Sequence, residues 1–195
     1  MKKFVITNKD FKGYVNEICR QISLKSWRPD YIIGITRGGL VPAVMISHYF
    51  KIPMKSLDVS LRDGGDLTSN LWMAEDAHGS SAEKHVSDEN DVASILEAAS
   101  ELLEQGETYK NILIVDDIND SGETFNWIMK DWQASCLPKS SEWENVWNQN
   151  VKFAVVVDNL ASKCNVKMDF TGLEIDKSKE DVWVEFPYES WWKNI

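Results

Sequence analysis

The chain contains 195 residues, 43% of them hydrophobic, which is enough to bury one sizeable core and indicates a single globular domain spanning residues 1–195. The formal net charge of −10 argues against a nucleic-acid partner, because phosphate backbones bind basic surfaces. No apolar stretch has the length of a transmembrane helix or a signal peptide, and the three cysteines are widely spaced, so we expect a cytoplasmic protein with no membrane partner, disulfide framework or zinc site.

The first predicted element is an amphipathic helix that begins at Asn8, a suitable N-cap, and ends near Trp27. Its apolar side chains recur at helical spacing, which indicates packing against the core and not a cofactor site. They are Phe11, Tyr14, Val15, Ile18 and Ile22.

A short apolar run at 31–36 predicts a strand, and it leads through Arg37, Gly38 and Gly39 into a helical pattern at 40–50. Glycine lets the backbone turn sharply and approach a ligand closely, and arginine offers a fork of donors to phosphate oxygens. This segment taken alone is weak evidence for an anion site, because two glycines after a strand are more often a tight turn. A further strand is expected around 54–60.

The least regular part of the chain, at 62–107, is interpreted as an insertion. Its first part is rich in Gly, Ser and Asp and suits a mobile lid, because long loops in compact domains are usually functional or disordered. Leu71, Trp72 and Met73 either seal a closed lid or anchor the loop to the core. A helix with an apolar stripe is expected over 92–103.

Four apolar residues, Ile112 to Val115, run directly into Asp116 and Asp117. The run is typical of a strand buried on both faces of a parallel sheet, whose carboxyl end is where such sheets bind ligands. Ionised carboxylates only accept hydrogen bonds, so the two acids suit a pair of vicinal hydroxyls such as those of ribose.

Small and polar residues follow this pair and open a helical pattern at 125–131. Free backbone N–H groups and the positive end of the helix dipole would meet there, which suits a phosphate monoester. The residues concerned are Asp120, Ser121, Gly122, Glu123 and Thr124. The alternative is an ordinary strand, turn and capped helix with solvated aspartates.

Three more strands are expected, at 151–158, 169–175 and 182–186. Helical patterns lie between several of the strands, and this alternation predicts an α/β fold with a mostly parallel central sheet flanked by helices. The last strand belongs to an aromatic-rich end, DVWVEFPYESWW.

The segment from Ile112 to Thr124 resembles the phosphoribosyl pyrophosphate-binding signature of type I phosphoribosyltransferases at every position of that signature. The chain is most similar to the xanthine-guanine and hypoxanthine-guanine enzymes of this family. The resemblance implies the type I phosphoribosyltransferase fold, with a lid at about 62–107 and a small hood formed by chain-terminal segments, whose purine-recognition elements lie at about 158–195.

The resemblance also implies roles for individual residues. Asp120 acts as general base toward the purine and Arg37 assists the leaving pyrophosphate, so these two are the catalytic candidates. The bond between Thr36 and Arg37 is expected to be a cis peptide. The remaining implied contacts are ribose at Asp116 and Asp117; the 5′-phosphate at Asp120, Ser121, Gly122, Glu123 and Thr124; pyrophosphate at Thr36, Arg37, Gly38 and Gly39; and the purine at Trp183 by stacking, at Val184 by edge recognition and at Asn159.

Magnesium is the expected cofactor, because two carboxylates beside a pyrophosphate need a cation between them. Asp117, directly or through substrate and water, and Glu189 are its candidate ligands. The chain departs from the family after the strand at 151–158, where a lysine that reads the purine 6-oxygen is replaced by Asp158 and Asn159. Lys163 is a possible substitute, and a 6-amino base stays open beside guanine, hypoxanthine and xanthine.

The function that follows is transfer of the phosphoribosyl group to a purine in purine salvage, giving a nucleoside monophosphate and pyrophosphate. The alternatives are a non-catalytic regulatory protein of the same fold, which binds phosphoribosyl pyrophosphate or a nucleotide, and a pyrimidine or other acceptor. The nine tryptophans lead us to expect a homodimer or homotetramer.

Overall fold

The computed structural model describes residues 2–59, 71–79 and 109–194. A five-stranded sheet with strand order β3-β2-β4-β5-β6 forms its centre, and every neighbouring pair is parallel. The α/β class and the mostly parallel sheet predicted from the sequence are therefore confirmed. The strands are β2 (Tyr31–Ile35), β3 (Met54–Leu57), β4 (Ile112–Asn119), β5 (Val151–Asn159) and β6 (Phe170–Ile175).

The three central strands, β2, β4 and β5, are largely apolar and buried, as expected where both faces of a sheet are covered. Along β4, Ile112 and Ile114 belong to one buried cluster, whereas Leu113 and Val115 belong to the other. All four side chains are fully buried. This is the burial pattern that a short apolar run without polar alternation predicts.

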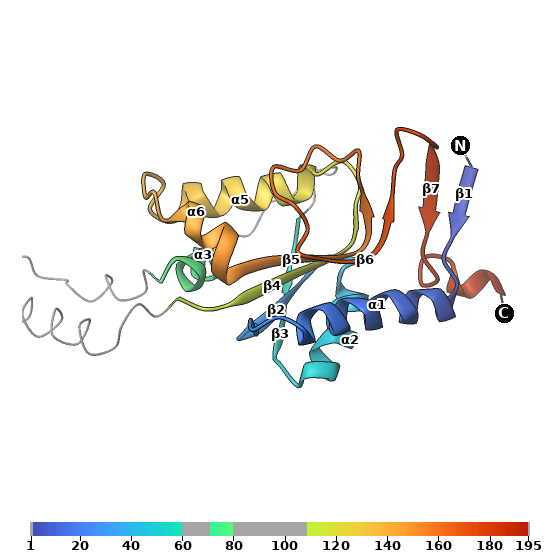
Figure 1. The fold of residues 1–195 in the computed structure, drawn as a ribbon, viewed down its shortest axis with the longest axis horizontal. Helices are drawn as coiled ribbons and strands as arrows, with labels where there is room; N and C mark the ends of the chain where they lie inside the picture. The colour runs from blue at the N-terminus through green and yellow to red at the C-terminus, as the bar shows by residue number, and fades with distance from the viewer. Residues whose placement is uncertain (1, 60–70, 80–108, 195) are drawn as a thin grey trace, which may run out of the picture.

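Helices form a layer on each face of the sheet (Figure 1). One layer holds α1 (Asn8–Ser23) and α2 (Leu40–Phe50). The other holds α3 (Leu71–His78), α5 (Glu123–Ser135), α6 (Trp143–Asn145) and the π-helix η2 (Val146–Asn150). No helix in the described ranges is both long and apolar enough to span a bilayer.

The first helix differs from its prediction at both ends. Thr7, not Asn8, is the N-cap: its Oγ1 accepts a hydrogen bond from the backbone N of Asp10, and the Asp10 carboxylate accepts one from the backbone N of Thr7. This reciprocal pair is a capping box. The helix ends at Ser23, earlier than expected.

The region predicted as an insertion is described only at 71–79. Met73 lies buried in the core, Leu71 packs against it and Trp72 is 45% exposed, so the start of α3 anchors this segment to the sheet. The helix predicted over 92–103 lies outside the described residues.

A second, two-stranded parallel sheet joins the chain ends, with β1 (Lys2–Val5) paired to β7 (Val182–Glu185) (Figure 1). A short 3-10 helix, η3 (Trp191–Asn194), follows β7. β1 was not expected from the sequence. This pair adds the aromatic-rich chain end to the carboxyl edge of the main sheet, where Phe186 and Tyr188 pack against Phe11 of α1.

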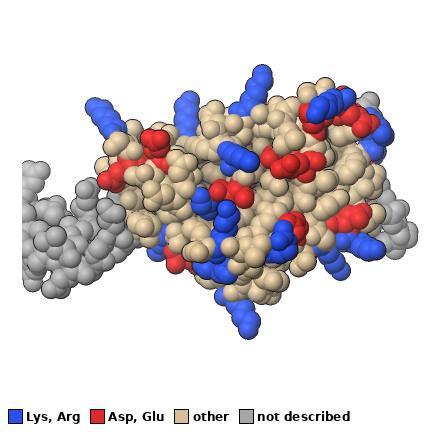
Figure 2. Space-filling view, viewed as in Figure 1, with Lys and Arg blue, Asp and Glu red and all other residues tan. Residues whose placement is uncertain are grey.

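The strand order reverses between β2 and β4, because β2 leads to β3 on one side whereas β4 leads to β5 and β6 on the other. A crevice at the carboxyl ends of strands forms at such a reversal, and ligands of open α/β sheets bind there. The face drawn in Figure 2 carries interspersed basic and acidic side chains.

Candidate active site

A cavity of about 1640 Å³ opens at this reversal point. Three chain segments contribute most of its lining. From the end of β2 and the segment after it come Ile35, Thr36, Arg37 and Gly38; from β4 and the start of α5 come residues 116–125; and from the chain end come Lys177, Trp183, Val184, Phe186, Tyr188, Glu189 and Trp192.

The two predicted ribose-binding acids lie next to each other within β4, which continues beyond the apolar run to Asn119. Asp116 is 9% exposed and accepts a hydrogen bond from the backbone N of Asp117 at 2.9 Å. Burial, together with the neighbouring charge of Asp117, raises the pKa of Asp116 well above its usual value. Two carboxylates in one desolvated place favour a bound cation or hydroxyl donors.

Asp117 is held by a residue to which the sequence assigned no role. The Tyr188 hydroxyl donates a 2.8 Å hydrogen bond to Asp117 Oδ2. Burial raises the pKa of Asp117, and the Tyr188 hydrogen bond opposes that rise. Burial and the Asp117 charge raise the pKa of Tyr188, so this hydroxyl remains a donor. The only signal in the sequence was the aromatic cluster FPYES, which did not single out Tyr188.

The segment after β2 contacts the acid pair directly. The Thr36–Arg37 peptide is cis, as the family resemblance predicted. Thr36 Oγ1 donates to Asp58 Oδ1 at 2.7 Å, and a Cβ atom at Gly38 would lie 1.8 Å from Asp117 Oδ2. Gly38 is therefore required by contact with Asp117. Gly39 packs against the backbone of β4 and does not line the cavity.

The predicted phosphate cradle forms the N-terminus of α5. Gly122 has a φ of 88° and lies so close to the backbone N of Cys164 that a Cβ atom would be 2.3 Å from it. The first intrahelical bond is donated by Asn126 to Gly122, so the N–H groups of Thr124 and Phe125 have no partner within the helix. These donors and the helix dipole face the cavity and suit an anion.

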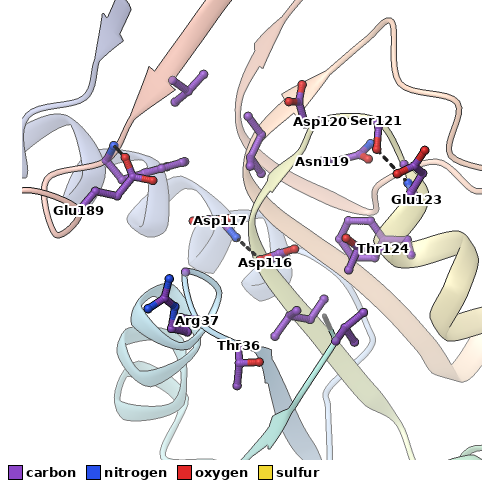
Figure 3. A pocket seen from close by; sticks show the side chains of 18 of the residues that line it. Thr36, Arg37, Asp116, Asp117, Asn119, Asp120, Ser121, Glu123, Thr124 and Glu189 are labelled. Carbon is purple, nitrogen blue, oxygen red and sulfur yellow. Dashed lines mark hydrogen bonds between the residues drawn. The ribbon is translucent and has the colours of Figure 1, made fainter. Parts of the chain in front are cut away.

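Figure 3 shows how the labelled side chains are arranged around the acid pair. Thr36 and Arg37 lie on one side of Asp116 and Asp117, whereas Asp120, Ser121, Glu123 and Thr124 lie on the other. The acid pair therefore separates the two segments that were predicted to bind phosphates.

Asp120 is an exposed residue that forms a 2.7 Å ion pair with Lys177, which follows β6. Of the three residues predicted to bind the purine, Asn159 is the one that does not line the cavity. Asn159 is 6% exposed, and its side-chain amide binds backbone groups, including the Asp120 carbonyl oxygen. Trp183 and Val184 of β7 do line the cavity, and Trp183 is 43% exposed whereas Val184 is buried.

Glu189 also lines the cavity, and its Oε2 accepts a hydrogen bond from the backbone N of Phe186 at 3.2 Å. Burial raises the pKa of Glu189, with the Asp117 charge adding to the effect. Within the described ranges, no group of three or more His, Cys, Asp or Glu side chains could hold a metal. A cation here would therefore need oxygen ligands from a substrate in addition to the carboxylates.

A parallel α/β sheet with an acid pair between two glycine-containing turns at its reversal point is the arrangement that the family resemblance led us to expect. The family model for the phosphoribosyl transferase domain matches residues 6–190. The chain therefore belongs to the phosphoribosyltransferase family, as a type I member close to the 6-oxopurine enzymes.

Three relatives illustrate this similarity. The hypoxanthine-guanine phosphoribosyltransferase of Schizosaccharomyces pombe is 23% identical over 193 residues, which cover 90% of this chain and 85% of that protein. The xanthine-guanine phosphoribosyltransferase of Cereibacter sphaeroides is 30% identical over 135 residues, covering 64% of this chain and 66% of the relative. The crystal structure of a purine phosphoribosyltransferase from Pyrococcus horikoshii shares the fold, with a TM-score of 0.57 at 21% identity, covering 97% of this chain and 96% of that one.

Proposed function

We propose that this phosphoribosyltransferase transfers the phosphoribosyl group of phosphoribosyl pyrophosphate to a purine base in purine salvage, with guanine, hypoxanthine or xanthine as acceptor. The observation that carries the proposal is that the acid pair of β4, the N-terminus of α5 and the 36–38 segment line one cavity. The hydroxyls of that substrate's sugar need hydrogen-bond acceptors such as the acid pair. Its 5′-phosphate and its pyrophosphate need donors, such as the N-terminus of α5 and the 36–38 segment.

Each segment then has a defined task. Asp116 and Asp117 accept hydrogen bonds from the ribose hydroxyls. The N–H groups at the start of α5 bind the 5′-phosphate, with Ser121 and Thr124 beside them. Arg37 donates to the pyrophosphate, so that the sugar is fixed at both ends with its C1 atom open to the base.

The reaction is displacement of pyrophosphate from C1 by a purine ring nitrogen, with inversion. Asp120 accepts the proton that the purine imidazole edge loses, and Trp183 offers a ring on which the base stacks, a contact worth roughly 1 to 3 kcal/mol. Arg37 stabilises the negative charge that develops on the leaving group.

Magnesium fits the donor set, because hard carboxylate oxygens are what it prefers, and among the described residues no basic side chain forms an ion pair with Asp116 or Asp117. Asp117 would hold it, with Glu189 as a second candidate. When bound, the ion would neutralise charge on the pyrophosphate.

The test is incubation of the full chain with magnesium, phosphoribosyl pyrophosphate and each purine in turn, with pyrophosphate release as the readout. Release that depends on guanine, hypoxanthine or xanthine is the expected result. Binding of the activated sugar without turnover of any base would favour the regulatory alternative, and turnover with uracil or orotate alone would reassign the acceptor.

A further inference from the structure

Asn159, the last residue of β5, is a buried polar residue to which the proposed function gives no task. It is 6% exposed and does not line the cavity, yet its side-chain amide binds three backbone groups in different chain segments. Oδ1 accepts from the backbone N of Ala161 at 3.1 Å and of Lys177 at 3.0 Å, and Nδ2 donates to the backbone O of Asp120 at 2.9 Å. Because two N–H groups meet one side of the amide, that side is the oxygen and the side facing Asp120 is the donor.

The loop that begins at Asn159 lies against the turn at 120–122, where the predicted phosphate-binding segment starts. The bond from the backbone N of Ala161 to Asn159 Oδ1 closes an Asx turn, which bends the chain after β5. Two residues further along, the backbone N of Lys163 donates to the backbone O of Ser121 at 3.0 Å. Two successive carbonyl groups of the turn, those of residues 120 and 121, are therefore held from the side of this loop.

The direction of these two carbonyl groups decides where the turn presents its donors. In a planar trans peptide the C=O group and the N–H group of the next residue point in opposite directions. The peptides that join residues 120 to 122 are trans. With both carbonyl groups directed at the loop, the N–H groups of Ser121 and Gly122 are directed away from it, and both of these residues line the cavity. The contacts behind the turn therefore orient N–H groups that a bound anion would meet.

We propose that Asn159 is a positioning residue for the 5′-phosphate: by holding the Asp120 carbonyl group, it directs backbone N–H groups of the 120–124 segment at that phosphate. The inference rests on the proposed function, and it adds a residue outside the cavity on which phosphate binding depends. It gives Asn159 a task different from the purine contact that the family resemblance implied. Donors that are oriented before the ligand arrives cost less to order on binding.

The substitution Asn159→Asp is nearly isosteric and changes one of the three contacts. A carboxylate still accepts from the backbone N of Ala161 and of Lys177, but it presents an oxygen to the Asp120 carbonyl group in place of a donor. The carbonyl group must turn away from this oxygen, and the N–H group of Ser121 turns with it because the peptide is planar.

The experiment is calorimetry of the full chain and of Asn159→Asp with two probes in the presence of magnesium. Phosphoribosyl pyrophosphate carries the 5′-phosphate, whereas inorganic pyrophosphate lacks it. We expect Kd for phosphoribosyl pyrophosphate to rise by about 10- to 100-fold, as the loss of one hydrogen bond to a charged group predicts. Kd for pyrophosphate should stay within about threefold, because that probe depends on the 36–38 segment.

Asn150 provides a matched control, because it directly precedes β5 and lies at the opposite end of the strand from Asn159. It is 5% exposed, and its Nδ2 donates to the backbone O of Ala77 at 2.8 Å and of Lys110 at 3.1 Å. Asn150→Asp therefore removes similar buried hydrogen bonds and should also lower the free energy of unfolding. Asn150 does not line the cavity, so Kd for both probes should stay within about threefold.

A second variant keeps the test decisive if Asn159→Asp folds poorly. Asn126 of α5 is partly exposed and holds the same loop: its Nδ2 donates to the backbone O of Lys163 at 3.0 Å, and its Oδ1 accepts from the backbone N of Asn165 at 2.8 Å. Asn126→Ala releases the loop without altering a buried residue. It should raise Kd for phosphoribosyl pyrophosphate by about three- to tenfold and leave Kd for pyrophosphate unchanged.

Equal weakening of both probes in Asn159→Asp would indicate a general distortion and would overturn the inference. An unchanged Kd for phosphoribosyl pyrophosphate in this variant, or an equal rise in Asn150→Asp, would overturn it as well. In each of these outcomes the wild type binds phosphoribosyl pyrophosphate, so the proposed function stands. A wild type that gives no heat with phosphoribosyl pyrophosphate would instead refute the proposed function, and this inference with it.

Discussion

The contact between Gly38 and Asp117 allows a substitution whose effect can be worked out from the structure. In Gly38→Ala the new Cβ would lie 1.8 Å from Asp117 Oδ2 and 2.5 Å from its Cγ, where ordinary contact begins at 3.4 Å. The carboxylate must therefore recede by roughly 1.5 Å, which also breaks its 2.8 Å hydrogen bond from Tyr188.

Displacement of a substrate-binding group by about 1 Å can cost roughly 100-fold in rate. We expect kcat/KM of Gly38→Ala for phosphoribosyl pyrophosphate to fall by about that factor, equivalent to about 2.7 kcal/mol. The assay is steady-state pyrophosphate release at fixed magnesium, with circular dichroism and thermal unfolding to confirm that the variant is folded.

The matched control is Gly13→Ala in α1, because nothing lies within 4 Å of a Cβ atom there. Alanine in a helix interior should raise the free energy of unfolding by about 0.5 to 1 kcal/mol without affecting activity. In an Asp117→Ala background the atoms that the new Cβ would meet most closely are absent, so Gly38→Ala should lower the free energy of unfolding by less than it does in the wild type. Activity of Gly38→Ala within threefold of wild type would refute the reasoning.

Three further predictions concern the acid pair. Asp117→Asn should lower turnover at least about tenfold, because it weakens the contacts to ribose and metal; wild-type turnover in this variant would remove the assignment. Tyr188→Phe removes the donor to Asp117 and should lower kcat/KM by about tenfold with a raised magnesium requirement, measured by magnesium titration of the rate; an unchanged titration curve would mean that Tyr188 does not position Asp117.

The third prediction follows from the raised pKa of Asp116. The contribution of Asp116 to folding stability is present below the usual aspartate pKa of 3.8, and it is lost as the pH rises through the pKa of Asp116 in the folded state. Asp116→Asn should therefore unfold at a higher temperature than wild type in the ligand-free state, by an amount that grows with pH. A difference in Tm that is constant from acid to neutral pH would contradict this.

The features that could be predicted from the sequence are local ones. A buried strand is recognisable by its apolar run, and the acids and glycines that follow it are neighbours in the chain. The segments at 36–38 and 116–124, which line the cavity, could therefore be located from the sequence. Element ends were less predictable: β4 continues through both acids to Asn119, because its pairing with β5 continues there.

The features that could not be predicted depend on chain segments that meet only in the folded protein. Lys2 pairs with Val182 between β1 and β7, and the Tyr188 hydroxyl reaches Asp117 across 71 positions of sequence. The pairing of Lys177 with Asp120 is of the same kind. The sequence around Tyr188 and around Lys177 contains no local pattern that identifies the residue each one contacts.

The central claim is that the carboxyl end of β4 binds a phosphorylated ribose. Isothermal titration calorimetry of the full chain with phosphoribosyl pyrophosphate and magnesium tests it most directly, with Asp117→Asn as the comparison. We predict saturable heat at one site per chain, strongly weakened in Asp117→Asn. The absence of heat with the wild type, or equal binding by both proteins, would contradict the account.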